Sequence, residues 1–364
     1  MTAATDLIRP EIDALKAYHV ADASGYLKLD AMENPHTLPA PMRAELGALL
    51  AEALIHRYPD PQAETVKQRL VQALDLPTEA EILLGNGSDE IIQIIAMTLA
   101  RPGATLLALE PSFVMYRMIA TFCGLGYVGV PLKADFALDM PATLDAIRTH
   151  RPAVTFIAYP NNPTGNRFSP EDVATLIEAA APGLVVVDEA YHAFAADSFM
   201  SRVLDHPNVV VMRTLSKLGL AGLRLGFLVG SADWLGAFDK VRLPYNINVL
   251  TQVAASYALD HIAVFNAQAA DIRAERSRLA AGLAALSGWT VYPSEANFLL
   301  ARVPDAPAVF AGLKAAGILI KNLHGAHPML DNCLRFTVGS RSDNDAVLSA
   351  LAALTQGALP TVAP

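Results

Sequence analysis

One short segment of the chain combines an amine, two hydroxyls and two guanidinium groups around a glycine-containing turn. It runs Arg213-Thr214-Leu215-Ser216-Lys217 and continues through Ala221-Gly222-Leu223-Arg224. Hydroxyl and guanidinium groups donate hydrogen bonds to anionic oxygens, and arginine is well suited to phosphate. A lysine amine can act as a nucleophile or as a base when its surroundings lower its pKa. The segment is therefore a candidate for anion binding beside a reactive amine.

Three other segments carry polar side chains close behind an apolar run. They are Asn162-Pro163-Thr164-Gly165, Asp188-Glu189-Ala190-Tyr191, and the pair Ser88 and Asp89 after Gly85-Asn86-Gly87. Each alone has a structural explanation, since prolines make rigid turns and acidic or hydroxyl residues cap helices. Their common position after apolar runs favours one shared site.

The elements that position these residues are predicted from hydrophobic patterning. From about residue 80 onward, short apolar runs alternate with helical patterns, which is typical of a parallel α/β sheet. The segment Ser169-Pro170-Glu171-Asp172 predicts the start of a helix between two strands. Ligands of such sheets bind beyond the carboxyl ends of the strands. The predicted strands are 82–84, 105–109, 154–158, 184–187, 209–212 and 225–229.

The pattern changes after about residue 250, where a long alanine-rich helical stretch, 252–286, leads to a smaller mixed region. We expect an α/β fold with a large domain, whose mostly parallel central sheet is covered by helices, and a smaller α+β domain. The expected division is an N-terminal arm and start of the small domain at 1–35, the large domain at 36–250, and the small C-terminal domain at 251–364.

Composition excludes several classes of function. The 364 residues are 53% hydrophobic and 17% charged, with a net charge of −9 and no basic cluster, so we expect no nucleic-acid partner. No apolar run approaches the ~20 residues of a membrane span, and residues 1–10 lack the apolar stretch of a signal peptide. Cys123 and Cys333 are too isolated to suggest a metal site. We expect a cytoplasmic protein.

The chain resembles the aspartate-aminotransferase-like enzymes that use pyridoxal 5'-phosphate, and within them the histidinol-phosphate aminotransferases. The resemblance runs from Leu29-Asp30-Ala31-Met32-Glu33-Asn34-Pro35 to Leu334-Arg335-Phe336-Thr337-Val338-Gly339. No single motif identifies the family, but their order along the chain is highly specific. The ordered motifs are Arg57-Tyr58-Pro59, Asn162-Pro163-Thr164-Gly165, Asp188-Glu189-Ala190-Tyr191, Thr214-Leu215-Ser216-Lys217 and Arg335.

The resemblance implies a role for each residue at the cofactor. Lys217 would form the internal Schiff base and move the proton during catalysis, and Asp188 would hold the pyridine nitrogen protonated. Asn162 and Tyr191 would bond the phenolate oxygen, and Phe113 would stack on the ring. The implied phosphate ligands are Ser88, the backbone amide of Asp89, Thr214, Ser216, Arg224 and, from a partner subunit in a homodimer, Tyr58.

The resemblance also implies the substrates. These are L-histidinol phosphate and 2-oxoglutarate, which exchange an amino group by a ping-pong mechanism in histidine biosynthesis to give imidazole acetol phosphate and glutamate. Arg335, Tyr18 and Asn34 are the implied substrate-binding residues. An aromatic amino-acid aminotransferase, or more distantly a phospho-amino-acid decarboxylase, would look similar.

Three features depart from the family pattern. Met32 stands where the family commonly has asparagine. Lys217 and Arg224 are seven residues apart, one fewer than in many relatives. Between Arg9 and Arg43 there is no arginine, although some relatives use a basic residue there to hold the substrate phosphate.

Two further motifs suggest other chemistry. Gly124-Leu125-Gly126-Tyr127-Val128-Gly129 matches a dinucleotide-binding fingerprint, which would make the protein a nucleotide-dependent dehydrogenase. However, it follows a helical pattern, and Pro131 prevents a helix from continuing after it. His324 and His327 have the spacing of metal ligands, but no third ligand lies nearby in the sequence, so we predict no metal site.

Overall fold

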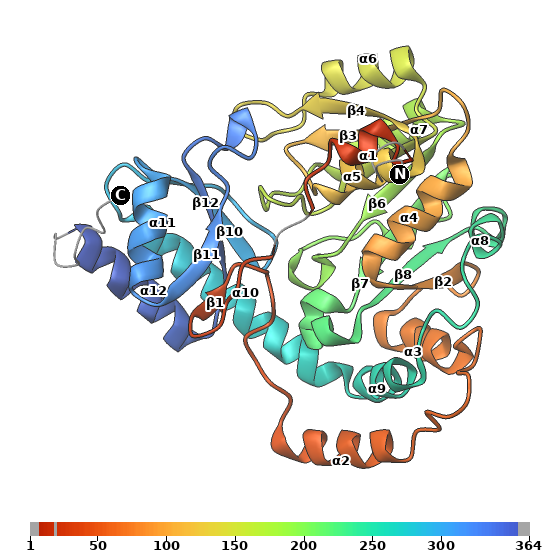
Figure 1. Ribbon diagram of the computed structural model, residues 1–364, viewed down its shortest axis with the longest axis horizontal. Coiled ribbons are helices and arrows are strands. Elements are labelled where there is room, and N and C mark those ends of the chain that lie inside the picture. The colour runs from red at the N-terminus through yellow and green to blue at the C-terminus, as the bar shows by residue number, and fades with distance from the viewer. Residues whose placement is uncertain (1–6, 18–19, 356–364) are drawn as a thin grey trace.

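The computed structural model describes residues 7–17 and 20–355, which form two β-sheets, each with its own helices (Figure 1). The larger sheet has seven strands and the smaller has five. The two parts are connected by the segment near residues 30–40 and by one long helix, α10 (Ile262–Ala284). The predicted fold class, a large α/β part with a smaller α+β part, is confirmed.

The seven-stranded sheet is mostly parallel, and only its last strand in chain order, β8, runs antiparallel to both of its neighbours. All the strands predicted from the sequence are present, and β4 is an additional strand at one edge. Across the sheet the order is β2 (Glu81–Asn86), β8 (Leu225–Gly230), β7 (Val209–Thr214), β6 (Leu184–Asp188), β5 (Val154–Ala158), β3 (Thr105–Glu110) and β4 (Gly126–Pro131).

The central strands are apolar along their whole length because helices cover both faces of the sheet. Every residue of β5, β6 and β7 is buried. One face is covered by α4 (Gly87–Leu99), α5 (Met115–Cys123) and α8 (Ala232–Asp239). The other is covered by α3 (Glu64–Leu74), α6 (Met140–His150), α7 (Pro170–Ala180) and α9 (Val249–Asp260).

The predicted helix start at Ser169 is confirmed at α7. The Ser169 hydroxyl accepts a hydrogen bond from the backbone amide of Asp172 at 3.1 Å, and Pro170 is the first helical residue. The hydroxyl satisfies an amide that has no partner within the helix, and proline loses nothing at this position because its missing N–H is not needed. This cap fixes the start of the crossover between β5 and β6.

The smaller sheet includes a strand from the beginning of the chain, β1, which pairs in parallel with β11. Its order is β1 (Leu27–Leu29), β11 (Ile318–Asn322), β12 (Cys333–Thr337), β10 (Phe298–Arg302) and β9 (Thr290–Val291). Its hydrophobic core also takes side chains from α10 (Ile262–Ala284), α11 (Ala306–Ala315) and α12 (Arg341–Thr355). The N-terminal segment therefore completes a sheet made mainly from the end of the chain.

The helical stretch expected at 252–286 consists of two helices, α9 and α10, separated at His261. α9 packs against α3 and α2 (Ala40–Ala51), whereas α10 packs against the small sheet and α12. The division of domains at residue 251 stays a prediction. The remaining helical segments are α1 (Pro10–Asp13), η2 (His192–Phe194), η3 (Met200–Arg202), η4 (Ser216–Leu220), η5 (Ala221–Leu223) and η6 (Pro328–Leu330).

The glycine motif at 124–129 has a structural role. Gly124 ends α5 in the left-handed conformation (φ 74°), and the rest of the motif passes into β4. A dinucleotide fingerprint needs the reverse order, a strand followed by a helix. Within the described ranges, no helix is both long and apolar enough to cross a membrane, and no group of three potential ligands could hold a metal ion.

The approach of β8 to the start of α4 is too close for any residue but glycine. A Cβ added at Gly226 would lie 2.7 Å from the carbonyl carbon of Gly87 and 2.8 Å from the amide nitrogen of Ser88. Both are backbone atoms, which cannot move without shifting the helix. Gly226 also pairs with Thr214 in β7, so this contact sets the spacing of residues predicted to bind an anion.

Gly226→Ala should lower the free energy of unfolding by about 1–3 kcal/mol, because the added methyl group overpacks a backbone contact. Urea denaturation of the cofactor-free protein measures this loss. Gly222→Ala is the matched control, since a Cβ there meets nothing within 4 Å. Equal denaturation midpoints for the two variants would contradict the proposed constraint.

Candidate active site

The carboxyl ends of β5, β6 and β7 face the start of α4, and a cavity lies between them. All the residues predicted to bind the cofactor line this cavity except Tyr58. Met32, Tyr116, Ala158, Pro160 and Ala190 also line it. The full lining is Met32, Ser88, Asp89, Phe113, Tyr116, Ala158, Pro160, Asn162, Asp188, Ala190, Tyr191, Thr214, Ser216, Lys217 and Arg224.

Asp188 is the buried acid of this cavity, with only 5% of its surface exposed. One carboxylate oxygen accepts a hydrogen bond from the Tyr116 hydroxyl at 2.6 Å, and the other accepts one from the amide of Ala190 at 3.0 Å. Burial raises the pKa of Asp188 to about 6, against the effect of these two hydrogen bonds. Near neutral pH it is mostly an anion that a cationic ring nitrogen can neutralise.

Lys217 is a weakly paired amine in the same cavity. Its Nζ donates to the backbone carbonyl of Ala31 at 3.2 Å and lies 5.9 Å from the centre of the Tyr191 ring. Burial lowers the pKa of Lys217 to about 8, and the positive charge of Arg335 acts in the same direction. A larger fraction of this amine is therefore neutral and nucleophilic near neutral pH than of an ordinary lysine.

The start of α4 forms an anion-binding end of the cavity. Helix N-termini present backbone amides that have no partner within the helix, and Ser88 and Asp89 lie in this first turn. The Arg224 guanidinium reaches the same place and pairs with the Asp89 carboxylate at 3.2 Å. A Cβ at Gly87 would lie 2.6 Å from Arg224 Nη2, so the glycine leaves room for this guanidinium.

Two hydroxyls complete the anion-binding end. The Thr214 hydroxyl lies 3.0 Å from that of Ser216 and also accepts the Ser216 amide at 3.1 Å. Both side chains are buried at the end of β7. The shorter spacing between Lys217 and Arg224 is accommodated by η4 and η5, and Arg224 itself adopts the left-handed conformation (φ 49°).

Tyr191, Met32 and Phe113 enclose the centre of the cavity. The Tyr191 hydroxyl lies 3.2 Å from the Met32 sulfur, and the Tyr191 ring packs edge-on against Phe298. Met32 has a left-handed backbone (φ 55°), which asparagine tolerates better than methionine. The position of the family's asparagine therefore lies at the cavity, as expected of a substrate-side residue, although the side chain present is apolar.

Arg335 lies in a second hollow that shares Met32, Phe113 and Asn162 with the first. Its guanidinium donates to the Asn162 side-chain oxygen at 2.7 Å and to the backbone carbonyl of Asp30 at 2.9 Å. These contacts hold a nearly buried guanidinium in one orientation. The structure therefore brings Arg335 beside the cofactor cavity, where the sequence predicted a substrate ligand.

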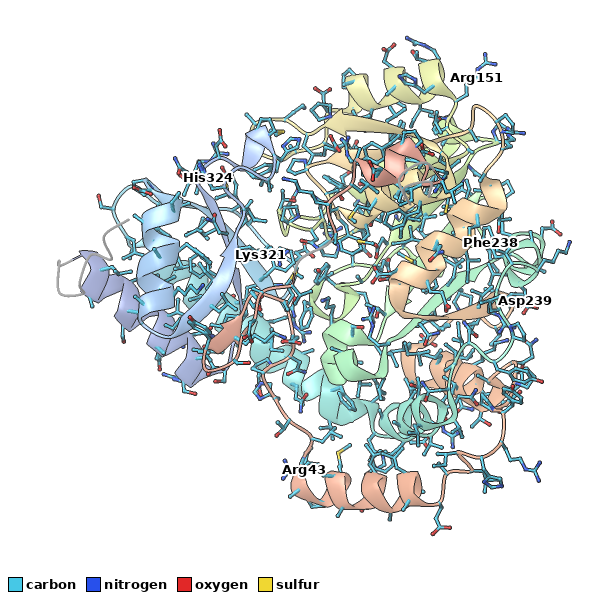
Figure 2. The ribbon with its side chains drawn as sticks, in the orientation of Figure 1. Arg43, Arg151, Phe238, Asp239, Lys321 and His324 are labelled. Atoms are coloured by element: carbon cyan, nitrogen blue, oxygen red, sulfur yellow. The ribbon has the colours of Figure 1, made fainter. Side chains whose placement is uncertain are left out.

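Lys321, which no sequence motif indicated, lines the same hollow. Lys321 pairs with Arg335 in the antiparallel register of β11 and β12, so both side chains point to the same face of the small sheet. Figure 2 shows Lys321 at the border between the two sheets. No local pattern in β11 indicates this, because Lys321 follows three consecutive apolar residues and its place beside Arg335 depends on the strand register.

Two predicted residues are not brought into the cavity. Tyr58 is 81% exposed and stacks on Tyr245, with 4.6 Å between ring centres. The Asn34 amide donates to the carbonyl of Leu218 and to Gln268, so it ties the N-terminal segment to the loop that carries Lys217. Tyr18 lies outside the described residues.

His324 and His327 have no metal-like arrangement. Each ring accepts a hydrogen bond from a backbone amide, His324 from Asn332 and His327 from Met329. These contacts stabilise the loop around η6.

Comparison with known proteins gives consistent matches over almost the whole chain. The family model described as aminotransferase class I and II matches residues 24–351. Histidinol-phosphate aminotransferase of Chromobacterium violaceum is 59% identical, covering 95% of this chain and 97% of that protein. Histidinol-phosphate aminotransferase 1 of Burkholderia lata is 54% identical, and the match covers 96% of this chain and 98% of that protein.

Solved structures agree on the fold. The crystal structure of histidinol-phosphate aminotransferase from Sinorhizobium meliloti in complex with pyridoxal-5'-phosphate is similar with a TM-score of 0.86 at 24% sequence identity. The match covers 96% of this chain and 98% of that one. The predicted aspartate-aminotransferase-like architecture is therefore confirmed at the level of the fold.

We expect the Lys217 amine of the cofactor-free protein to titrate near pH 8, because burial and Arg335 disfavour its charged form. Its acetylation rate, followed by peptide mass spectrometry, should reach half of its maximum near that pH. The exposed Lys240 is the control, because its amine is open to solvent. Parallel rate curves for Lys217 and Lys240 would contradict the lowered pKa.

Proposed function

The chain belongs to the class I and II aminotransferase family, and from that premise we propose how it performs its reaction. It transfers the amino group of L-histidinol phosphate to 2-oxoglutarate in histidine biosynthesis, giving imidazole acetol phosphate and glutamate. The observation that carries this function is the similarity, over nearly the full length, to histidinol-phosphate aminotransferases at 54% and 59% identity. The roles of individual residues below are our proposal.

The cavity fits pyridoxal 5'-phosphate, the cofactor of this family. Its phosphate is a dianion and needs several donors, which the start of α4 and the end of β7 provide. The Asp89 carboxylate is itself an anion and would repel the phosphate, so the backbone amide of Asp89 in the first turn of α4 is the better ligand. The proposed phosphate ligands are Ser88, the amide of Asp89, Thr214, Ser216 and Arg224.

The other end of the cavity fits the ring of the cofactor. Asp188 would hold a proton on the ring nitrogen, Asn162 and Tyr191 would donate to the phenolate oxygen, and Phe113 would cover one face. When bound, the cofactor supplies an aldehyde that takes up amino groups and a ring that withdraws electrons.

Lys217 has two proposed tasks. Its Nζ would hold the cofactor covalently before substrate arrives. Once released, the same atom would take a proton from the substrate α-carbon and deliver it to the bound cofactor. A pKa of about 8 suits both tasks, because the amine gains and loses a proton within the working range of pH. The carbonyl of Ala31, 3.2 Å away, orients the amine when it is free.

Arg335 and Lys321 are the proposed anion ligands for the substrates. They would bind the phosphate of histidinol phosphate in one half-reaction and a carboxylate of 2-oxoglutarate in the other. Arg335 is oriented for this by Asn162 and the carbonyl of Asp30. Lys321 supplies a second positive charge, which compensates for the absence of arginine between Arg9 and Arg43.

The protein should use histidinol phosphate with a higher kcat/KM than phenylalanine or tyrosine, by about 100-fold, because two cations contact the phosphate. Steady-state rates of each donor with 2-oxoglutarate measure the ratio. Lys321→Met should lower kcat/KM for histidinol phosphate by roughly 10-fold, the loss of one contact to a charged group, and change the rate with phenylalanine much less.

A higher kcat/KM for an aromatic amino acid would instead identify an aromatic amino-acid aminotransferase. Release of carbon dioxide from a phosphorylated amino acid would identify a decarboxylase. Arg151→Gln is a suitable control, because Arg151 lies at the end of α6, far from the small sheet in Figure 2, and should leave every donor ratio unchanged.

We also propose a homodimer in the cytoplasm, whose two sites are completed across the interface. Apolar residues are exposed on two segments that meet where Tyr58 stacks on Tyr245. We call them the 49–58/243–250 patch: Leu49, Leu54, Ile55, Tyr58, Leu243, Tyr245 and Leu250. Exposed apolar patches of this kind mark protein interfaces.

A second copy of the chain is the proposed partner for this patch. α2, which carries Leu49 of the patch, buries only Met42 and contacts the rest of the molecule mainly through α9 at the lower edge of the view in Figure 1. In the family the tyrosine of the Arg57-Tyr58-Pro59 motif reaches the cofactor phosphate of the partner subunit. Such an arrangement explains why Tyr58 lies outside the cavity of its own chain.

Mixing inactive Tyr58→Ala and Lys217→Ala proteins should restore activity after subunit exchange. In an equal mixture about half of the dimers are mixed and each has one intact site, so the recovery should approach about one quarter of the wild-type rate. Each variant mixed with itself is the control. Absence of recovery, with mixed dimers demonstrated by native mass spectrometry, would contradict shared sites.

A further inference from the structure

Tyr116 makes a direct contact with the acid of the active site, although no motif pointed to it. Its hydroxyl donates to Oδ2 of Asp188 at 2.6 Å, a short distance typical of a hydrogen bond to a charged acceptor. Tyr116 is completely buried. A tyrosine hydroxyl away from water must have a partner, and the carboxylate of Asp188 is that partner.

The ring of Tyr116 also touches the residue that is proposed to cover the cofactor. It packs edge-on against Phe113, with 5.6 Å between ring centres and 88° between planes, and stacks on Phe156 of β5 at 4.7 Å. Phe113 precedes α5 and Tyr116 is the second residue of that helix, so one turn of chain carries both aromatic residues. The position of Phe113 therefore depends on the ring that contacts Asp188.

The charges around Asp188 make this hydrogen bond important. Asp89 and Glu189 both raise the pKa of Asp188, in addition to the larger effect of burial. The Glu189 charge is paired with Arg213 at 2.9 Å, and Asp89 is paired with Arg224. Lys217, Arg224 and Tyr191 line the same cavity. The hydrogen bond from Tyr116 lowers the pKa of Asp188 and so favours its charged form.

Tyr116 itself stays protonated. Burial and the neighbouring carboxylate raise its pKa well above the ordinary value of a tyrosine. The Tyr116 hydroxyl is therefore always a hydrogen-bond donor. The Asp188 oxygen that accepts this hydrogen bond is held in one orientation.

We propose that Tyr116 is a positioning residue, which keeps Asp188 ionised and aimed at the cofactor ring nitrogen and couples that acid to the ring-covering Phe113. The inference rests on the proposed function for the role of Asp188. The first turn of α5 would thus set the charge and direction of Asp188, the acid that contacts the ring nitrogen.

Tyr116→Phe tests this, because it removes the hydroxyl and keeps the ring. In the loaded enzyme kcat should fall by roughly 10-fold to 100-fold, as for other residues that orient a group in contact with a cofactor, while KM for histidinol phosphate stays nearly constant. The acid limb of the kcat/KM profile should move to higher pH by about one unit, because Asp188 then ionises less readily.

A second readout uses the cofactor-free protein. The folded pKa of Asp188, about 6, lies above its ordinary value of 3.8, so its contribution to stability is present at low pH and is lost as pH rises through 6. In Tyr116→Phe the folded pKa is higher, so the loss continues to higher pH. The deficit in melting temperature relative to wild type should therefore grow as the pH is raised above 6.

The double variant Tyr116→Phe with Asp188→Asn separates positioning from packing. With no ionisable group at 188, the deficit caused by Tyr116→Phe should be independent of pH. If the deficit in melting temperature still grew with pH in the Asp188→Asn background, the inference would be overturned. A deficit that did not change with pH when Asp188 is present would also overturn it.

Tyr257→Phe is the matched control, because it removes a 2.7 Å hydrogen bond from a buried tyrosine to Glu45, and neither residue lines the cavity. It should leave the acid limb of the pH profile in place, and a shift equal to that of Tyr116→Phe would overturn the inference. Failure of the proposed function would be seen separately, as a wild-type protein without transaminase activity, while the melting experiment on the cofactor-free protein still decides the role of Tyr116.

Discussion

Burying a carboxylate at the end of a fully buried strand costs free energy unless hydrogen bonds compensate for the lost water. The elements around the large sheet are arranged so that they supply these hydrogen bonds. Asp188 ends β6, where every neighbouring residue is buried. The amide of Ala190 and the hydroxyl of Tyr116 repay part of the desolvation. α5 must therefore pack in one position, so that Tyr116 reaches the carboxyl end of β6. Phe113, which would cover the cofactor ring, lies just before α5 and is placed by the same packing.

Close backbone contacts connect this acid to the anion-binding end of the cavity. Gly226 lets β8 approach the first turn of α4, and Gly87 leaves room for the guanidinium of Arg224. The antiparallel direction of β8 brings Arg224 back to the same edge at which β6 and β7 end. The cavity is thus built from strands of both directions, and the small sheet adds Arg335 and Lys321 to the adjoining hollow.

The sequence predicted what depends on local pattern. Strands such as β5 and β6 were recognised because both faces are buried, and the cap at Ser169 because its signal lies within four residues. The edge strand β4 was missed, since two glycines, a proline and partial exposure weaken its pattern. Tyr116 and Lys321 were missed because their roles come from helix packing and strand register. Tyr58 was placed by resemblance alone.

The segment that joins the two sheets anchors two functional cations by its main chain. The carbonyls of Asp30 and Ala31 accept from Arg335 and Lys217, and the amide and carbonyl of Met32 are bonded to Thr337 and Asn297. Side-chain replacement leaves these acceptors in place. Laboratory evolution of donor choice can therefore vary the side chain at position 32 among residues that tolerate its left-handed backbone, asparagine above all, while both carbonyl acceptors stay in place.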